Sequence, residues 1–365
     1  MLMKQRTQYV DIAKGFSIIA VVLWHINFTI GNFSLFPIKT IVAGGGWHVP
    51  CFFLISGFFL KEEKLLTPLS FIRSKLSTLY LKILYFYIPA TLLHNAFIHW
   101  GFYSIQETYG GKQMFFYTKI DFLKKLLAAI LFAGREPIVG PLWFAYVLCL
   151  ALIGYSIISF ICQKIWKKNY TKARAILLIF LACISAIASN KLNLTLNRFS
   201  NTLVVMGLLA IGQHTFQFHR EKFNSPILFI CAILLFLQNA ILNGDIALNN
   251  NSYNDLFHLF LGSLCMLHVI CFISIKLEKT LVGKIVSTIG EKSFEVMALH
   301  IFIFHLISLI AFKFNLITNP TSLNPSTNNF AIILCYCLIG TIAPVILALG
   351  WERLLSGIKK CASRK

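Results

Sequence analysis

YVDIAKGFSIIAVVLWH (residues 9–25) is the stretch that decides the fold. Between Lys14 and His25 it is almost wholly apolar, which is typical of a membrane helix. A helix turns about 100° per residue, so Asp11, Lys14 and His25 share one face, and His25 lies roughly 16 Å deeper than Lys14. An imidazole at the middle of a hydrocarbon layer is costly and usually marks a site or pathway. The stripe therefore favours a functional His25 over a histidine that only hydrogen-bonds a neighbouring helix.

The whole chain has the composition of a polytopic membrane protein. Its 365 residues are 57% hydrophobic and only 13% charged, with a mean hydropathy of +0.74. We expect an all-α fold, a bundle of about ten transmembrane helices, forming one domain over residues 1–365. An additional stretch, 122–134, is expected to be an interfacial helix. The apolar stretches expected to span are 12–30, 47–60, 78–98, 141–162, 174–189, 202–217, 226–242, 256–275, 294–313 and 330–350.

The net charge of +20 is distributed as in a membrane protein and not as in a nucleic-acid-binding one. With the N-terminus inside and ten spans, 24 of the 33 Lys and Arg residues fall in cytoplasmic segments. Both termini are therefore expected in the cytoplasm, and no segment is long enough for a soluble nucleic-acid-binding domain. The first apolar run lacks a cleavage site and is expected to remain as an anchor. The ten cysteines lie singly, so they predict neither a disulfide framework nor a metal site.

Polar residues lie in and after the second predicted span. His48 precedes a proline at the mouth of this span and, taken alone, is an ordinary interfacial histidine. Ser56–Gly57 within the span are small residues that permit close helix contact. Arg73, Lys75 and Lys82 follow it and have the charge to bind the phosphates of a nucleotide cofactor such as coenzyme A. Ordinary positive-inside charge explains these three cations equally well.

Two later spans carry the remaining candidates. Trp143 opens a span in GPLWF (140–144), where a tryptophan usually anchors the helix at the interface. Ser293 and His300 are seven residues apart in one helix and share a face. Glu295 needs a partner in or near the membrane, and a Lys or His from another helix would be enough. The sequence has no GxSxG, HExxH, Walker or GxGxxG motif, which disfavours hydrolase, metalloprotease and ATPase functions.

The longest segment between apolar stretches runs from about His99 to Gly140, and Asn-rich loops follow at 243–254 and 315–329. Aromatic rings and amides suit sugar recognition, although solvated connectors have the same composition. The residues that would form a polar basin for a sugar are Tyr103, Tyr109, Tyr117, Tyr253, Asn249, Asn250 and Asn251.

Five of these segments, in this order, resemble the acyltransferase-3 family of integral membrane O-acyltransferases. Much of that family carries Arg where this chain has Lys14, and the chain looks closer to a branch resembling fucose 4-O-acetylases, which carries Lys. The resembling segments are DIAKG…VVLWH (11–25), HVPCFFLISGFFL (48–60), the basic segment 71–89, GPLWF (140–144) and GEKSFEVMALH (290–300).

The resemblance implies transfer of an acetyl group from cytoplasmic acetyl-CoA to a sugar hydroxyl on the other side of a bacterial inner membrane. The acceptor would be a surface polysaccharide or lipid-linked glycan of the O-antigen or capsule type. A neutral histidine in a dry site suits the general base that such a transfer needs, so His25 is expected to act with Lys14 and Asp11. The donor would contact Lys14, Arg73 and Lys75. The residues expected to line the same cavity as His25 are His48, Trp143, Ser293 and His300.

Two other functions fit the same hydropathy. A transporter or flippase of lipid-linked sugars would also place polar groups in the membrane, but it predicts paired broken helices and repeat symmetry. A non-catalytic envelope assembly or sensor protein would leave His25 replaceable. Within the acyltransferase hypothesis, direct transfer and an acyl-histidine intermediate both stay open.

Overall fold

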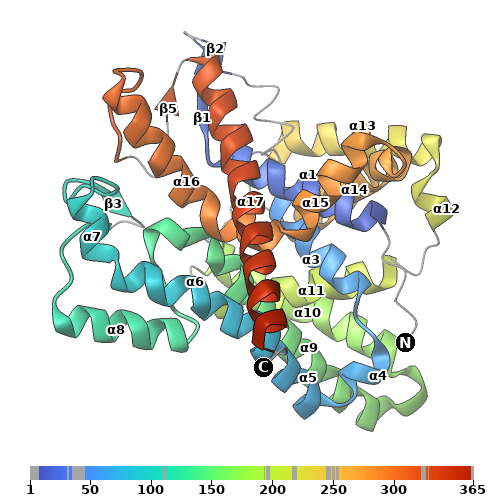
Figure 1. Ribbon diagram of the computed structural model, residues 1–365. Helices are drawn as coiled ribbons and strands as arrows, with labels where there is room; N and C mark the ends of the chain where they lie inside the picture. Colours follow the sequence, from blue (N-terminus) through green and yellow to red (C-terminus); the bar gives the residue numbers. More distant parts are fainter. Residues whose placement is uncertain are drawn as a thin grey trace.

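The computed structural model describes residues 8–30, 33–34, 46–109, 112–192, 194, 198–215, 220–243, 248, 251, 255–321, 326–327 and 329–362. These residues form a mainly α-helical protein (Figure 1). Each of the ten predicted apolar stretches contains an α-helix. Among the described residues, four segments are long and apolar enough to cross a membrane. They are Pro137–Lys191, Leu256–Leu277, Ser293–Lys313 and Phe330–Ile358.

One π-helical turn and two 3-10 turns lie between the α-helices of the described residues. A π-helical turn (Leu76–Tyr80) precedes α6, and 3-10 turns (Pro137–Leu142 and Lys167–Asn169) flank α9. The helices are α1 (Gln8–Trp24), α3 (His48–Phe58), α4 (Glu62–Leu65), α5 (Pro68–Lys75), α6 (Leu81–Leu92), α7 (His94–His99), α8 (Lys119–Ile130), α9 (Trp143–Trp166), α10 (Tyr170–Lys191), α11 (Arg198–Thr215), α12 (Arg220–Phe223), α13 (Pro226–Asn243), α14 (Leu256–Leu277), α15 (Leu281–Glu291), α16 (Ser293–Lys313) and α17 (Phe330–Ala362).

Two small sheets lie outside the helices. β1 (Asn27–Ile30) pairs antiparallel with β2 (Phe33–Ser34) and parallel with β5 (Ser326–Thr327). β3 (Thr108–Tyr109) and β4 (Lys112–Gln113) form an antiparallel hairpin. The first sheet joins the chain that leaves α1 to the chain that leads into α17.

Several helix limits differ from the predicted ones. The first helix ends at Trp24 and not at residue 30, because the chain turns there and pairs as β1 with strands distant in sequence. The predicted 78–98 helix is divided between α6 and α7. The interfacial helix begins at Lys119, because Thr118 and Asp121 form a capping box at its start. The last helix continues past residue 350 to Ala362.

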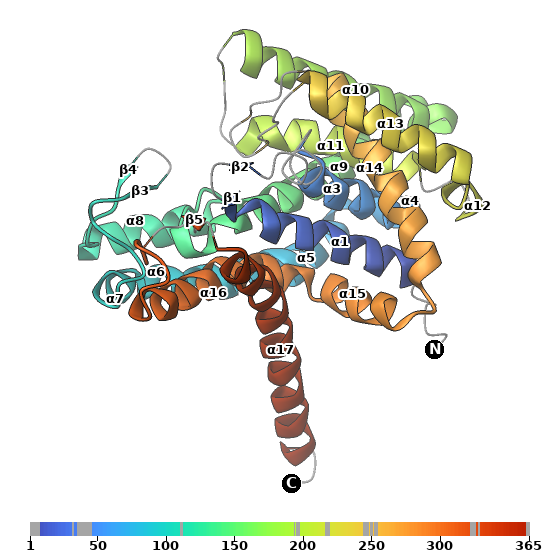
Figure 2. The same ribbon diagram turned by 90° about the horizontal axis from the view of Figure 1, so that it is seen from above.

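The helix α1 lies inside the protein. It contacts α3, α14, α15 and α16, and Figure 2 shows it between α3 on one side and α15 and α16 on the other. Its side chains Ile12, Ala13 and Val22 are fully buried. Because these side chains pack closely against the neighbouring helices, the position of α1 is fixed. The polar stripe of α1 is therefore held by a tightly packed frame.

Glycines make the closest helix contacts. A Cβ at Gly15 of α1 would overlap the Val286 carbonyl of α15, and one at Gly290 would overlap the Asp11 carbonyl. A Cβ at Gly57 of α3 would overlap the Leu209 carbonyl of α11. The predicted close contact at Ser56–Gly57 is therefore confirmed for Gly57. The backbone of Asp11 is fixed against α15 in the same way.

A methyl group at Gly290 should separate α1 from α15. We expect Gly290→Ala to lower the unfolding free energy by about 1–3 kcal/mol, as overpacking does in a dense interior. Gly350→Ala is the matched control, because nothing lies within 4 Å of a Cβ at that glycine of α17. The midpoint of SDS-induced unfolding measures the stability of the two variants. Equal midpoints for the two variants would show that the α1–α15 contact tolerates a Cβ.

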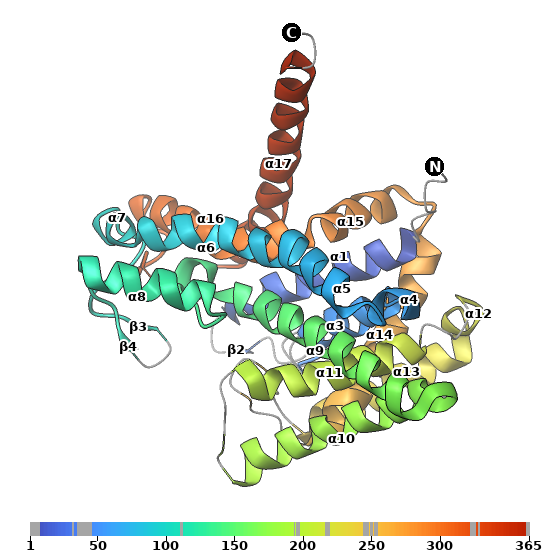
Figure 3. The same ribbon diagram turned by 90° about the horizontal axis from the view of Figure 1, so that it is seen from below.

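The helix α17 extends away from the other helices (Figures 2 and 3). Its distal part exposes the apolar side chains of Trp351, Leu354 and Ile358. Lys292, just before α16, forms an ion pair of 2.5 Å with Glu352 of α17. This ion pair fixes α17 to the start of α16.

Candidate active site

His25 and His300 meet where α1 ends. Their ring centroids are 5.0 Å apart, with the planes tilted by 57°. His25 directly follows α1, and its backbone N–H still donates to the Val22 carbonyl (3.2 Å), so it extends the last turn. His300 lies within α16 and is fully buried. The structure therefore brings together two histidines that are 275 residues apart.

The hydrogen bonds of both rings fix the same tautomer. His25 Nδ1 lies 2.9 Å from the Val21 carbonyl oxygen, and His300 Nδ1 lies 2.9 Å from the Val296 carbonyl oxygen. A carbonyl oxygen only accepts, so each Nδ1 donates and each neutral ring keeps a lone pair on Nε2. His300 Nε2 is buried and has no hydrogen-bond partner among the described residues. The pair therefore offers two proton-accepting nitrogens at one place.

His48 lies near the end of α1. It begins α3 and is buried. Its ring centroid is 5.7 Å from that of Trp24, the residue before His25. Three of the predicted histidines thus lie around the end of α1.

Asp11 and Lys14 form an ion pair of 3.2 Å at the other end of the stripe. Asp11 is almost fully buried, whereas the Lys14 side chain is 24% exposed. The Lys14 ammonium lies 4.9 Å from the centroid of the Phe59 ring. Because α1 is continuous up to Trp24, Lys14 lies roughly 16 Å along the axis from His25. The ion pair is thus too far away to touch His25, and its Lys14 side chain is partly exposed.

The other cations predicted near the donor have different surroundings. Arg73 is exposed at the end of α5. The Lys75 ammonium lies 5.0 Å from the Phe71 ring centroid, and burial, together with the charge of Lys64, lowers its pKa. Lys82 forms an ion pair of 2.7 Å with Glu295. Lys82 is thus the Lys partner that Glu295 was expected to need.

Among the described residues, no hydrogen bond or ring contact joins Ser293 or Trp143 to either histidine of the pair. Ser293 is the first residue of α16, roughly 10 Å along the axis from His300, toward the Lys82 ion pair. Trp143 begins α9, and its carbonyl accepts a hydrogen bond of 3.2 Å from Arg198 of α11. These positions give no direct support for a role of either side chain beside His25.

Sequence reasoning missed two networks of hydrogen-bonded polar side chains. In the first, the Arg174 guanidinium is fully buried and donates to both carboxylate oxygens of Glu62, at 2.6 and 2.8 Å. It also donates to Gln213 (2.9 Å) and Ser159 (3.1 Å). The network joins α4, α9, α10 and α11. The only sequence signals were a Glu and an Arg next to apolar stretches, and they resemble ordinary interfacial charges.

The second network lies in the predicted outer segment. His94 Nδ1 is 2.5 Å from Glu136 Oε1, and His94 Nε2 is 3.1 Å from the Phe115 carbonyl. The Tyr117 hydroxyl donates to Glu136 Oε2 at 3.2 Å, and burial, with the charge of Glu136, raises the pKa of this phenol. Both nitrogens of His94 therefore face oxygen atoms, and His94, Tyr117 and Glu136 form one buried hydrogen-bonded network.

One comparison with known proteins is informative. A family model for the acyltransferase-3 type, described as an acyltransferase domain, matches residues 7–349. No curated protein and no solved structure matches the chain. The matched range includes all five segments whose resemblance was noted above, and the histidine pair at the end of α1. The chain therefore belongs to the acyltransferase-3 family of membrane acyltransferases.

Proposed function

We propose that this protein is a membrane O-acetyltransferase that moves an acetyl group from cytoplasmic acetyl-CoA to a sugar hydroxyl of a surface polysaccharide or lipid-linked glycan. The observation that carries the proposal is the contact between His25 and His300, whose Nε2 atoms are both proton acceptors. Membership of an acyltransferase family supplies the reaction class. A base in a dry site is what transfer to an alcohol needs.

The reaction that this geometry supports has one base. The acceptor hydroxyl oxygen attacks the thioester carbonyl carbon while His25 Nε2 takes the hydroxyl proton. The tetrahedral adduct then collapses, the carbon–sulfur bond breaks, and His25 returns the proton to the departing thiolate. The products are the sugar ester and free coenzyme A. His300 Nε2 accepts a hydrogen bond from a second hydroxyl and orients the sugar.

The distance between Lys14 and His25 suits a long donor. Coenzyme A carries its phosphates at one end and its thioester at the other. With the phosphates near Lys14, Arg73 and Lys75, the pantetheine arm would extend along the face of α1 for roughly 16 Å to His25. Asp11 supports this by holding the Lys14 ammonium in place. No other pair of polar residues in the stripe offers this separation.

The proposed topology has ten crossings of a bacterial inner membrane with both termini in the cytoplasm. A helix in every predicted stretch and the cytoplasmic excess of Lys and Arg support it. The acceptor then approaches from outside, across the segment 99–140 and the loops 243–254 and 315–329. The remaining predicted sugar contacts, Tyr253, Asn249 and Asn250, lie outside the described residues.

Membranes that contain the protein test the proposed function. They are supplied with radiolabelled acetyl-CoA and envelope polysaccharide. We expect label in the glycan that mild alkali releases, since an ester is cleaved there and an amide is not. Membranes without the protein give the background. Absence of alkali-labile label, with folded protein present, would contradict O-acetyl transfer.

Charge reversal at Arg73 tests the donor path. We expect Arg73→Glu to raise the KM for acetyl-CoA roughly tenfold with little change in kcat, because an anionic donor loses one charged contact. Added salt should reduce the difference from the wild type. Arg353→Glu, an equal charge change on the exposed part of α17, is the control. An unchanged KM in Arg73→Glu would place the donor elsewhere.

A further inference from the structure

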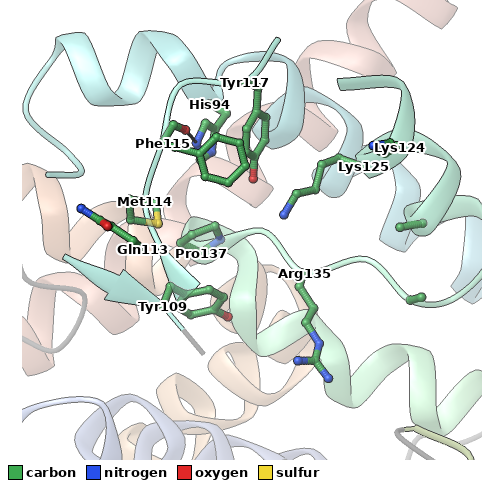
Figure 4. A pocket seen from close by; sticks show the side chains of 12 residues that line it. His94, Tyr109, Gln113, Met114, Phe115, Tyr117, Lys124, Lys125, Arg135 and Pro137 are labelled. Atoms are coloured by element: carbon green, nitrogen blue, oxygen red, sulfur yellow. Dashed lines mark hydrogen bonds between the residues drawn. The ribbon is translucent and has the colours of Figure 1, made fainter. Parts of the chain in front are cut away.

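A cavity of about 280 Å³ lies beside α8, the β3–β4 hairpin and the chain just before α9 (Figure 4). Its lining includes the cations Lys124, Lys125 and Arg135 and the rings of Tyr109 and Tyr117. Neither His25 nor His300 lines it. Whatever binds there is held apart from the histidine pair.

One wall of this cavity is rigid. The His94 and Tyr117 rings stack at 3.6 Å with their planes 2° apart. Both rings are fixed by the Glu136 carboxylate, which is fully buried. A buried polar network whose groups are hydrogen-bonded to one another holds one geometry. The wall is therefore preorganised for a ligand.

The charge of the cavity is positive. Glu136 is not among the residues that line the cavity, and its carboxylate contacts His94 and Tyr117. The Lys125 ammonium lies 5.0 Å from the Tyr117 ring centroid, and Figure 4 shows it extending from α8 toward the space between Tyr117 and Arg135. Asp121, one turn before Lys124, accepts a hydrogen bond from Thr118 at the start of α8. Its carboxylate offsets one of the positive charges. Among the described residues, three cations line the cavity and no acidic side chain does.

We propose that this cavity binds an oxyanion, a phosphate or carboxylate, that is part of the acceptor glycan. Cations supply the oxyanion contacts, and the Tyr109 and Tyr117 rings supply flat apolar faces for a sugar ring. The proposal rests on the proposed function, because it makes the cavity an anchoring subsite for the acceptor. The reacting hydroxyl belongs to another part of the same glycan, near His25.

Binding in the absence of acetyl-CoA tests this inference. The protein is placed in nanodiscs of phosphatidylcholine, and calorimetry measures binding of glucose 1-phosphate, glucuronate and glucose. We expect the two anionic sugars to bind at least about tenfold more tightly than glucose, with affinity falling as salt rises. Lys125→Gln and Arg135→Gln should each weaken the anionic sugars about tenfold. Lys119→Gln, an equal change on the same helix outside the cavity lining, should not.

Three outcomes would overturn the inference. Equal affinity for glucose and glucose 1-phosphate would show that charge is not recognised. Equal affinity of Lys125→Gln, Arg135→Gln and Lys119→Gln would place the anion elsewhere. Loss of sugar phosphate binding when phosphatidylglycerol is added to the nanodiscs would assign the site to a lipid headgroup and not to the glycan.

The His25→Gln variant separates this inference from the proposed function. It should bind glucose 1-phosphate as the wild type does, because His25 does not line the cavity. If that variant binds the probe but fails to transfer acetyl, the cavity assignment and the proposed function both hold. If the wild type transfers acetyl but does not bind the probe, only the cavity assignment fails.

Discussion

Replacing His25 with glutamine is expected to lower kcat for acetyl transfer by at least about 100-fold, the usual contribution of a general base. Glutamine can still donate a hydrogen bond to the Val21 carbonyl, so the local fold is kept. It cannot take a proton from a hydroxyl. The KM for acetyl-CoA should change little, because the donor phosphates are proposed to bind near Lys14. Initial rates in nanodiscs, normalised to folded protein, measure the effect.

Two other histidines give the controls. His99→Gln changes an exposed histidine of α7 and should leave kcat unchanged. His300→Gln removes the proposed orienting nitrogen and should cost less than His25→Gln. A near-normal rate in folded His25→Gln, or a larger loss of rate in His300→Gln than in His25→Gln, would show that His25 is not the base.

Removing the Glu62 carboxylate should strongly destabilise the protein. In Glu62→Ala, the fully buried Arg174 guanidinium loses both of its shortest hydrogen bonds and its counter-charge. An uncompensated buried charge costs about 3–5 kcal/mol. Glu63→Ala changes the exposed neighbouring residue and should stay within about 0.5 kcal/mol of wild type. SDS-induced unfolding measures both, and equal stability of the two variants would contradict a stabilising role of this ion pair.

The same ion pair predicts acid sensitivity. Burial tends to raise the pKa of the Glu62 carboxyl, but the hydrogen bonds and charge of Arg174 hold it below its usual value. A carboxyl with a lowered pKa in the folded state stabilises the protein above its unfolded pKa, and the contribution is lost as the pH falls through the folded value. Wild type should therefore lose stability in acid, and Glu62→Gln should lose less over the same range.

The shared helix face of the site residues in α1 was predictable from the sequence. The contacts between helices that are far apart in the sequence were not. Asp11, Lys14 and His25 share a helix face because helix periodicity acts within a few turns. The contact of His25 with His300 joins helices far apart in sequence, and no periodicity reports it. The partner of Glu295 was predictable as a class, Lys or His, but its identity as Lys82 depends on how α6 and α16 pack.

Long-range pairing also explains what the sequence did not predict in the fold. The first helix ends at Trp24 because β1 pairs with β5, almost 300 residues later. The Glu62–Arg174 and His94–Glu136 pairs join residues 112 and 42 positions apart. Each partner alone has the appearance of an ordinary interfacial charge. Only the tertiary structure shows that Arg174 is buried against Glu62 and that His94 is buried against Glu136.

The central claim is that His25 is the base for acetyl transfer from cytoplasmic acetyl-CoA to a glycan on the other side of the membrane. The most direct measurement of this claim uses sealed inverted membrane vesicles. Radiolabelled acetyl-CoA is added outside, at the cytoplasmic face, and the acceptor polysaccharide is enclosed in the lumen. With the wild type we expect alkali-labile label on the enclosed glycan, and with His25→Gln at least ~100-fold less. Label that appears only when the donor is enclosed with the acceptor, or that is undiminished in His25→Gln, would contradict the account.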